Sequence, residues 1–156
     1  MTPPIELIHK LPEPGEPGYF GALRKHDIHT GIDLYCEDGT PVCAMEDGVV
    51  VAIEKFTGEH AGSSWWNNTW AVLVEGSSGV IVYGEIIVDD ELLVGELVAE
   101  GQHLGNVTRV LKTDKGVTPT SMLHLELLEH GCYHTLWWSH GEPQPEELRN
   151  PIILFG

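Results

Sequence analysis

The chain has 156 residues, of which 24 are acidic and 8 are basic, and its formal net charge is −16. This length is enough for one domain with a sizeable core. The charge repels phosphate backbones and anionic membranes, which argues against nucleic acid and membrane partners. No apolar run approaches the roughly 20 residues of a membrane span, and the first residues lack the features of an export signal. We therefore expect a soluble protein, cytoplasmic unless a leader is missing from the sequence.

The opening of the chain is rich in proline and predicts an extended arm over residues 1–20. A single β domain is expected over residues 21–156, because short β-like runs with turn residues between them dominate from about Ile32 onward. The clearest runs are VVVAI (Val49 to Ile53), WAVLV (Trp70 to Val74) and VIVYGEIIV (Val80 to Val88). EGSSG between the last two predicts a hairpin. The one weak helical candidate is EELRN (Glu146 to Asn150).

The cysteines are odd in number and lack C-x-x-C spacing: Cys36, Cys43 and Cys132. A reducing compartment is the simplest interpretation, and a Cys36–Cys43 disulfide stays open as an alternative.

HTGID contains His29 and Asp33 four residues apart, a spacing that places both side chains on one side of a strand or a helix. Gly31 between them allows close approach of a backbone or a ligand. Further along, strand periodicity in SMLHLELL predicts a core-facing row of Leu123, Leu125 and Leu127.

The opposite, polar face of that strand displays Met122, His124 and Glu126. Two imidazoles and one carboxylate can hold a divalent metal in three positions and leave a fourth open, as in catalytic zinc sites. A chance pattern among nine histidines is the alternative that the residues alone leave open. Glu126 is expected either to orient a metal ligand from outside the coordination sphere or to face water.

Five segments resemble, in order and approximate spacing, the lysostaphin-type zinc endopeptidase family, whose members typically cut peptide cross-links of bacterial cell walls. They lie between about Gly21 and Glu129 and read HTGIDL, GTPVCAMEDGVVVAI, VYGEI, LVAEGQHLG and MLHLELL. The resemblance implies an all-β barrel-sandwich hybrid (duplicated hybrid motif) of short antiparallel strands. It also implies zinc as the cofactor, with His29, Asp33 and His124 as the ligands.

Two positions depart from the family pattern. Met122 stands where the resemblance implies the first catalytic histidine, and Glu85 stands where it implies the second. A thioether neither donates nor accepts a proton at neutral pH, so Met122 can only shape the pocket. Glu85 could serve as a general base, bind the metal directly, or point elsewhere.

Two main hypotheses follow. The first is a zinc-binding domain of this class that binds a peptide or protein ligand, with peptidase activity altered or lost. The second is an active zinc hydrolase of peptide bonds that uses Glu85 as its base. A non-haem iron oxygenase with two histidines and one carboxylate is a minor third. The other histidines, with His26 as a reserve ligand, and the loop tryptophans WWNNTW (Trp65 to Trp70) and LWW (Leu136 to Trp138) are expected to be mostly surface or packing residues.

Overall fold

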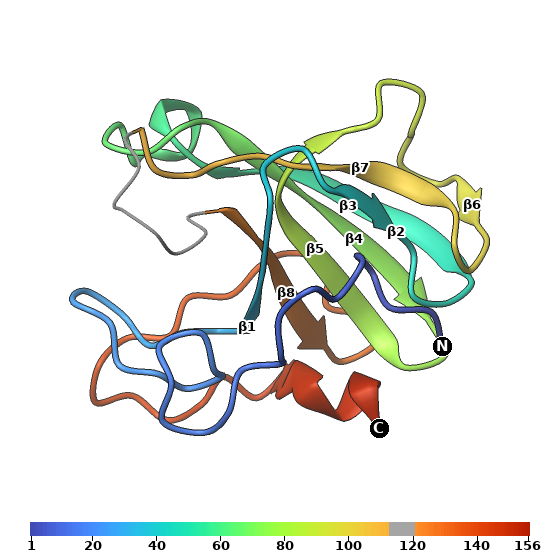
Figure 1. Cartoon of the computed structure of the whole chain (residues 1–156). Helices are drawn as coiled ribbons and strands as arrows, with labels where there is room; N and C mark the ends of the chain where they lie inside the picture. The colour runs from blue at the N-terminus through green and yellow to red at the C-terminus, as the bar shows by residue number, and fades with distance from the viewer. Residues whose placement is uncertain (113–120) are drawn as a thin grey trace.

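The computed structural model describes residues 1–112 and 121–156. Within these residues, nine strands join in one antiparallel sheet (Figure 1), which confirms the predicted all-β fold class. The strands are β1 (Ile32–Cys36), β2 (Pro41–Cys43), β3 (Gly48–Thr57), β4 (Thr69–Gly76), β5 (Gly79–Val88), β6 (Leu97–Val98), β7 (His103–Val107), β8 (Ser121–Leu128) and β9 (Leu148–Arg149). The helical segments in the described chain are two 3-10 turns, η1 (Glu59–Ala61) and η2 (Pro151–Phe155). No helix in these two ranges is both long and apolar enough to cross a bilayer.

The strands follow the order β1-β8-β5-β4-β3-β6, while β2 pairs with β7, β7 also pairs with β5, and β9 pairs with β8. All three of the β-like runs predicted from the sequence form strands, namely β3, β4 and β5. The predicted hairpin is also confirmed, since Gly76 pairs with Gly79 across the turn. The buried carboxylate of Glu46 stabilises this turn by accepting hydrogen bonds from the backbone N–H and the hydroxyl of Ser78, over 3.0 and 2.7 Å.

Apolar side chains cover both faces of the central strands. The larger core cluster takes Leu123, Leu125 and Leu127 from β8, as the strand alternation predicted. A second cluster contains Val80 and Val82 of β5, which point away from that core because successive strand residues alternate. The central strands are therefore buried on two sides rather than on one.

This second layer corrects one expectation for β8. His124 and Glu126 were predicted on a displayed polar face, but they are only 5% and 1% exposed. Loop residues that precede β1 and follow β8, among them Phe20 and Trp138, pack over this side of the sheet. The polar side chains of β8 consequently lie under a cover of loops, and Glu126 does not face water.

The predicted helix over Glu146 to Asn150 is wrong. Leu148 and Arg149 instead form β9, which pairs with Leu128 and Leu127 of β8. Leu148 is fully buried in the second core cluster. Tertiary pairing and burial outweigh the local helical preference of this short segment.

The first residues of the proline-rich segment lie beside β2 and are tied to it by a backbone hydrogen bond (dark blue in Figure 1). The N–H of Cys43 donates to the carbonyl of Pro4 over 2.9 Å, and Ile5 is 4% exposed in the larger core. The thiol of Cys43 donates to the carbonyl of Pro3 over 3.4 Å, and all three cysteines are free thiols. The Cys36–Cys43 disulfide considered from the sequence is therefore not formed in this structure.

Candidate metal centre

Strand pairing brings the two halves of the candidate site together. His29 lies just before β1, Asp33 lies within β1, and His124 lies in the middle of β8. β1 and β8 are antiparallel neighbours in which Asp33 stands directly opposite His124. Residues 91 positions apart in the chain thus become cross-strand partners.

Gly31 lets the segment between His29 and Asp33 lie flat against β8. A Cβ atom at this position would clash with the carbonyl oxygen of Leu125 and crowd the side chain of Glu126. Any other residue would push the segment away from the strand that carries His124. The close backbone approach anticipated from the sequence is therefore present, and it is made to protein rather than to a ligand.

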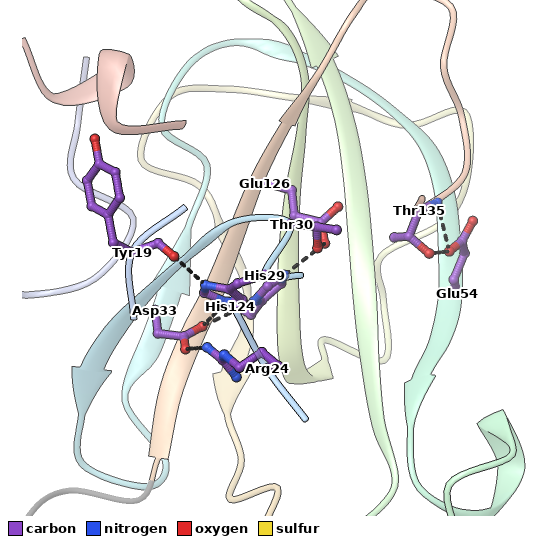
Figure 2. Close-up of polar contacts among 9 residues, drawn as sticks. All are labelled: Tyr19, Arg24, His29, Thr30, Asp33, Glu54, His124, Glu126 and Thr135. Atoms are coloured by element: carbon purple, nitrogen blue, oxygen red, sulfur yellow. Dashed lines mark hydrogen bonds and ion pairs between the residues drawn. The ribbon is translucent and has the colours of Figure 1, made fainter. Parts of the chain in front are cut away.

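Three buried atoms that could bind a metal ion converge at the centre of the site (Figure 2). Nε2 of His29 lies 3.0 Å from Oδ1 of Asp33 and 3.2 Å from Nδ1 of His124. Nδ1 of His124 lies 3.1 Å from the same Asp33 oxygen. These separations are close to the about 3.3 Å expected between neighbouring ligand atoms around a tetrahedral zinc with bonds of about 2.0–2.1 Å.

Hydrogen bonds on the far side of each imidazole fix which nitrogen faces the centre. Nδ1 of His29 donates to the carbonyl oxygen of Tyr19 over 2.9 Å, which leaves Nε2 with a lone pair. Nε2 of His124 donates to Oε2 of Glu126 over 2.8 Å, which leaves Nδ1 with a lone pair. The hydroxyl of Thr30 donates to that same Glu126 oxygen over 2.8 Å. Such outer partners are typical of metal-binding histidines, since they set the tautomer and orient the ring.

Charge around Asp33 favours its ionised form. Burial by itself raises the pKa of Asp33. When no metal is present and the central nitrogens carry protons, hydrogen bonds from His124 and His29 outweigh burial and hold this pKa well below its usual value. The second oxygen, Oδ2, accepts from Nη2 of Arg24 over 3.0 Å, and the same nitrogen donates to the carbonyl of Pro17 over 2.8 Å. Burial lowers the pKa of His124, yet its bonds to Asp33 and Glu126 raise this pKa well above the ordinary value. The ionised Asp33 and the nearby Glu126 therefore stabilise a positive charge at the centre, as a cation site requires.

A bulge in β5 determines where Glu85 points. Along β5, Ile81 and Tyr83 face the larger core, and strict alternation would place residue 85 there as well. The pairing with β4 skips residue 85, however, because Ala71 pairs with Gly84 and Trp70 pairs with Ile86. Ile86 takes the core position instead, so Glu85 is the extra residue of the bulge.

The bulge leaves Glu85 on the side of the sheet that carries His124. Its neighbour Gly84 pairs with His124 on β8. Glu85 has a φ of 65°, the only positive value at a non-glycine residue in the described chain. Burial, opposed by the charge of His124, raises the pKa of Glu85 to about 8. The residue as a whole is partly exposed, whereas its Oε2 atom is buried and has no hydrogen-bond partner in residues 1–112 and 121–156.

Two other side chains border the centre. Met122 is half-buried and lies on the same side of β8 as His124, two residues before it. The ring of Phe56 packs on the imidazole of His124, with ring centroids 5.4 Å apart. The reserve ligand His26 is exposed and does not belong to the cluster.

Several residues that support the cluster were not predicted from the sequence. Tyr19 contributes a backbone carbonyl, for which no residue pattern exists. Arg24, Thr30 and Phe56 act through side chains, but their partners lie on distant segments or in loops. The loop tryptophans Trp65 and Trp66 are 62% and 37% exposed and pack mainly on each other, with ring centroids 5.7 Å apart.

A buried His, Asp and His cluster on an antiparallel β domain offers the ligand set of a catalytic zinc site. More particularly, residues 27–135 match the model of peptidase family M23, and the chain belongs to that family. The comparison with curated proteins gives no match.

Solved structures share the fold at low identity. A protein from Pseudomonas aeruginosa assigned to peptidase M23 is 18% identical with a TM-score of 0.58, and the match covers 99% of this chain and 49% of that one. A protein from Ruminococcus gnavus assigned as a glycyl-glycine endopeptidase, lytM, is 20% identical with a TM-score of 0.53, covering 81% and 45%. Lysostaphin is 19% identical with a TM-score of 0.50, covering 82% and 43%. The chain thus spans about half, or less, of the length of the structures it matches.

Proposed function

We propose that the chain is a zinc-binding domain of the M23 class in which peptidase activity is altered or lost. The observation that carries the proposal is the convergence of three buried lone pairs, on His29, Asp33 and His124, each held in place by an outer hydrogen bond. Without a cation, these atoms stand 3.0–3.2 Å apart and need a proton between them to avoid repulsion. Zinc suits two imidazoles and one carboxylate, and when bound it polarises carbonyl groups and makes water a stronger nucleophile.

Altered activity is proposed because neither position where the family resemblance implies a catalytic histidine holds one: they hold Met122 and Glu85. Met122 cannot accept or donate a proton. A positioned acid or base contributes typically about 10²- to 10⁴-fold to the rate of a reaction. The chain therefore lacks a large part of the usual rate enhancement unless another group replaces those histidines.

A peptide or protein is the proposed ligand. The formal charge of −16 opposes binding to nucleic acid and to anionic membranes. Peptide carbonyl groups, by contrast, are neutral and are natural partners for zinc.

The second candidate function is active hydrolysis of peptide bonds with Glu85 as general base. It is favoured by one observation, namely that the bulge brings this carboxyl group to the side of the sheet that carries His124. In that role Glu85 would accept a proton from the attacking water. Its raised pKa of about 8 is suitable for a base near neutral pH.

Zinc analysis tests the first part of the proposal. Purified wild type should contain about one zinc per chain, and His124→Ala should lose it, because removal of an outer partner alone typically costs about 10- to 100-fold in metal affinity. His103→Ala is the matched control, since His103 is exposed and its ring nitrogens bond Asp89 and Asn106, away from the cluster. Equal zinc in all three proteins would reject the site.

Peptidase assays test the second part. With glycine-rich and cell-wall peptides, zinc-loaded wild type should show little or no cleavage, and the double variant Met122→His with Glu85→His should show more. Rapid, chelator-sensitive cleavage by wild type would reject the loss of activity. If Glu85→Gln then abolished that cleavage while retaining zinc, the general-base alternative would be the correct one.

A further inference from the structure

The carboxylate of Glu85 is placed by an irregularity of the strand rather than by ordinary alternation. One extra residue in β5 turns Glu85 out of the core row of Ile81 and Tyr83. The carbonyl oxygen of Glu85 accepts a hydrogen bond from the N–H of Thr108 over 3.1 Å, which holds the bulge in place. The direction of the side chain is therefore set by the backbone.

The conformation of Glu85 is costly for a residue with a side chain. A φ of 65° lies in the left-handed region, where a residue other than glycine typically costs about 1–2 kcal/mol. Glycine is the usual residue at such a bulge position. Backbone strain of this kind is typical of functional sites, where the side chain binds a ligand or takes part in chemistry.

One oxygen of this carboxylate finds no partner among the described residues. Its Oε2 atom is buried and without a hydrogen-bond partner there. The nearest cationic candidates are already engaged, since Arg24 is held by Asp33 and Pro17, and His124 is held by Glu126 and Asp33. An unpaired buried acceptor costs free energy, so a hydrogen-bond donor from outside the chain would be bound favourably.

The charge of the whole chain favours a cationic donor, whereas zinc and Arg24 together would balance the three nearby carboxylates. Asp33, Glu85 and Glu126 bring three carboxyl groups to this region, in which Arg24 pairs with Asp33 and His124 pairs with Asp33 and Glu126. The chain as a whole carries a formal charge of −16. A protonated amine is the common donor in peptides that suits this acceptor, and its charge would favour the ionised form of Glu85, which burial alone disfavours.

We propose that Glu85 is a specificity-determining residue that binds the protonated amino group of a peptide-like ligand whose carbonyl group faces the zinc centre. The inference rests on the proposed function, since zinc holds the carbonyl end of the same ligand. It assigns a ligand class, namely peptides or amino-acid derivatives with a free amino group close to the group that binds zinc. It also gives Glu85 a role in binding that does not require turnover.

Two small zinc-binding probes that differ only at the amine test this assignment. Glycine hydroxamate carries a free amine, and N-acetylglycine hydroxamate has the same chelating group without the positive charge. Calorimetric titration of zinc-loaded full-length protein should show the free amine binding about 10-fold tighter or more, as a charge-assisted hydrogen bond of about 1.5–3 kcal/mol implies. In Glu85→Gln the ratio should fall to near one, with zinc content unchanged. Glu91→Gln, which neutralises an exposed acid in the β5–β6 loop, should keep the wild-type ratio.

Each other outcome overturns the inference in a recognisable way. Equal affinity of the two probes for wild type, or an unchanged affinity ratio in Glu85→Gln, would show that Glu85 does not bind the amino group. Loss of zinc from Glu85→Gln would make Glu85 a metal ligand instead. Glu85→Gly, which suits the positive φ, repeats the test if the glutamine variant folds poorly. Absence of zinc from wild type would reject the proposed function itself, and this inference with it, before any probe is added.

Discussion

Asp33 and His124 face each other across neighbouring antiparallel strands, with Oδ1 of Asp33 3.1 Å from Nδ1 of His124. Since both side chains stand on a strand ladder, their separation is set by backbone hydrogen bonds rather than by flexible loops. His29 completes the cluster from a segment that is pressed against β8 at Gly31. A site built on rigid elements in this way keeps its geometry before any ligand arrives.

Replacing Gly31 with alanine should damage both stability and metal binding. The new methyl group would meet the carbonyl oxygen of Leu125, which is backbone and cannot move aside. Overpacking typically costs about 1–3 kcal/mol, and His29 would shift away from His124. Urea denaturation and zinc titration of Gly31→Ala measure the two effects. Wild-type values for both would mean that the segment does not need this close approach.

Glu126→Gln should weaken zinc binding about 10- to 100-fold while the protein stays folded. The reason is that the amide no longer provides the negative charge that holds the Nε2 proton of His124 and directs Nδ1 to the centre. Competition with a zinc chelator of known affinity measures the change. Glu54→Gln is a matched control, because Glu54 accepts a hydrogen bond from the Thr135 hydroxyl, outside the cluster. Equal zinc affinities in the two variants would contradict a supporting role for Glu126.

Glu85→Gly should be more stable than Glu85→Ala by about 1–2 kcal/mol in protein freed of metal. Both variants remove the carboxylate, whose Oε2 has no partner among the described residues, but only glycine relieves the backbone strain at a φ of 65°. The comparison requires chemical denaturation of the two proteins under identical conditions. If alanine proved as stable as glycine, the bulge at residue 85 would not adopt the left-handed conformation in solution.

Metal-free wild type should lose stability relative to Glu85→Gln as the pH rises from about 4.5 to about 8. Burial raises the pKa of Glu85 from 4.5 to about 8, so in this range the folded chain keeps a proton that the unfolded chain releases. The contribution of Glu85 is fully present below the unfolded pKa and disappears as pH passes the folded pKa. His124, whose raised pKa also removes stability at high pH, is present in both proteins and does not create the difference.

Denaturation at a series of pH values, with a chelator present, gives the stability difference directly. Asp33 acts in the opposite sense and in another range, because its lowered pKa removes stability only in acid, below its ordinary value of 3.8. A stability difference that stays constant between pH 4.5 and 8 would mean that the carboxyl group of Glu85 is solvated like an ordinary surface glutamate.

The sequence by itself determined those strands that short patterns of apolar and polar residues predict. Alternation in SMLHLELL correctly placed Leu123, Leu125 and Leu127 in the core, and the three strong apolar runs became β3, β4 and β5. The resemblance in ordered motifs gave the family, and it selected the three residues that the structure brings together. Such patterns can be recognised in the sequence because successive side chains along a regular strand point to opposite faces of the sheet.

Only the tertiary structure decided how those residues are used. The covering loops bury His124 and Glu126, and the carbonyl of Tyr19 fixes the tautomer of His29. β9 forms where a helix was expected, because Leu148 gains more from burial against β8 than from local propensity. The bulge that redirects Glu85 exists only in the register between β4 and β5. Register, loop packing and long-range hydrogen bonds join residues far apart in the chain, and no local pattern encodes those pairings.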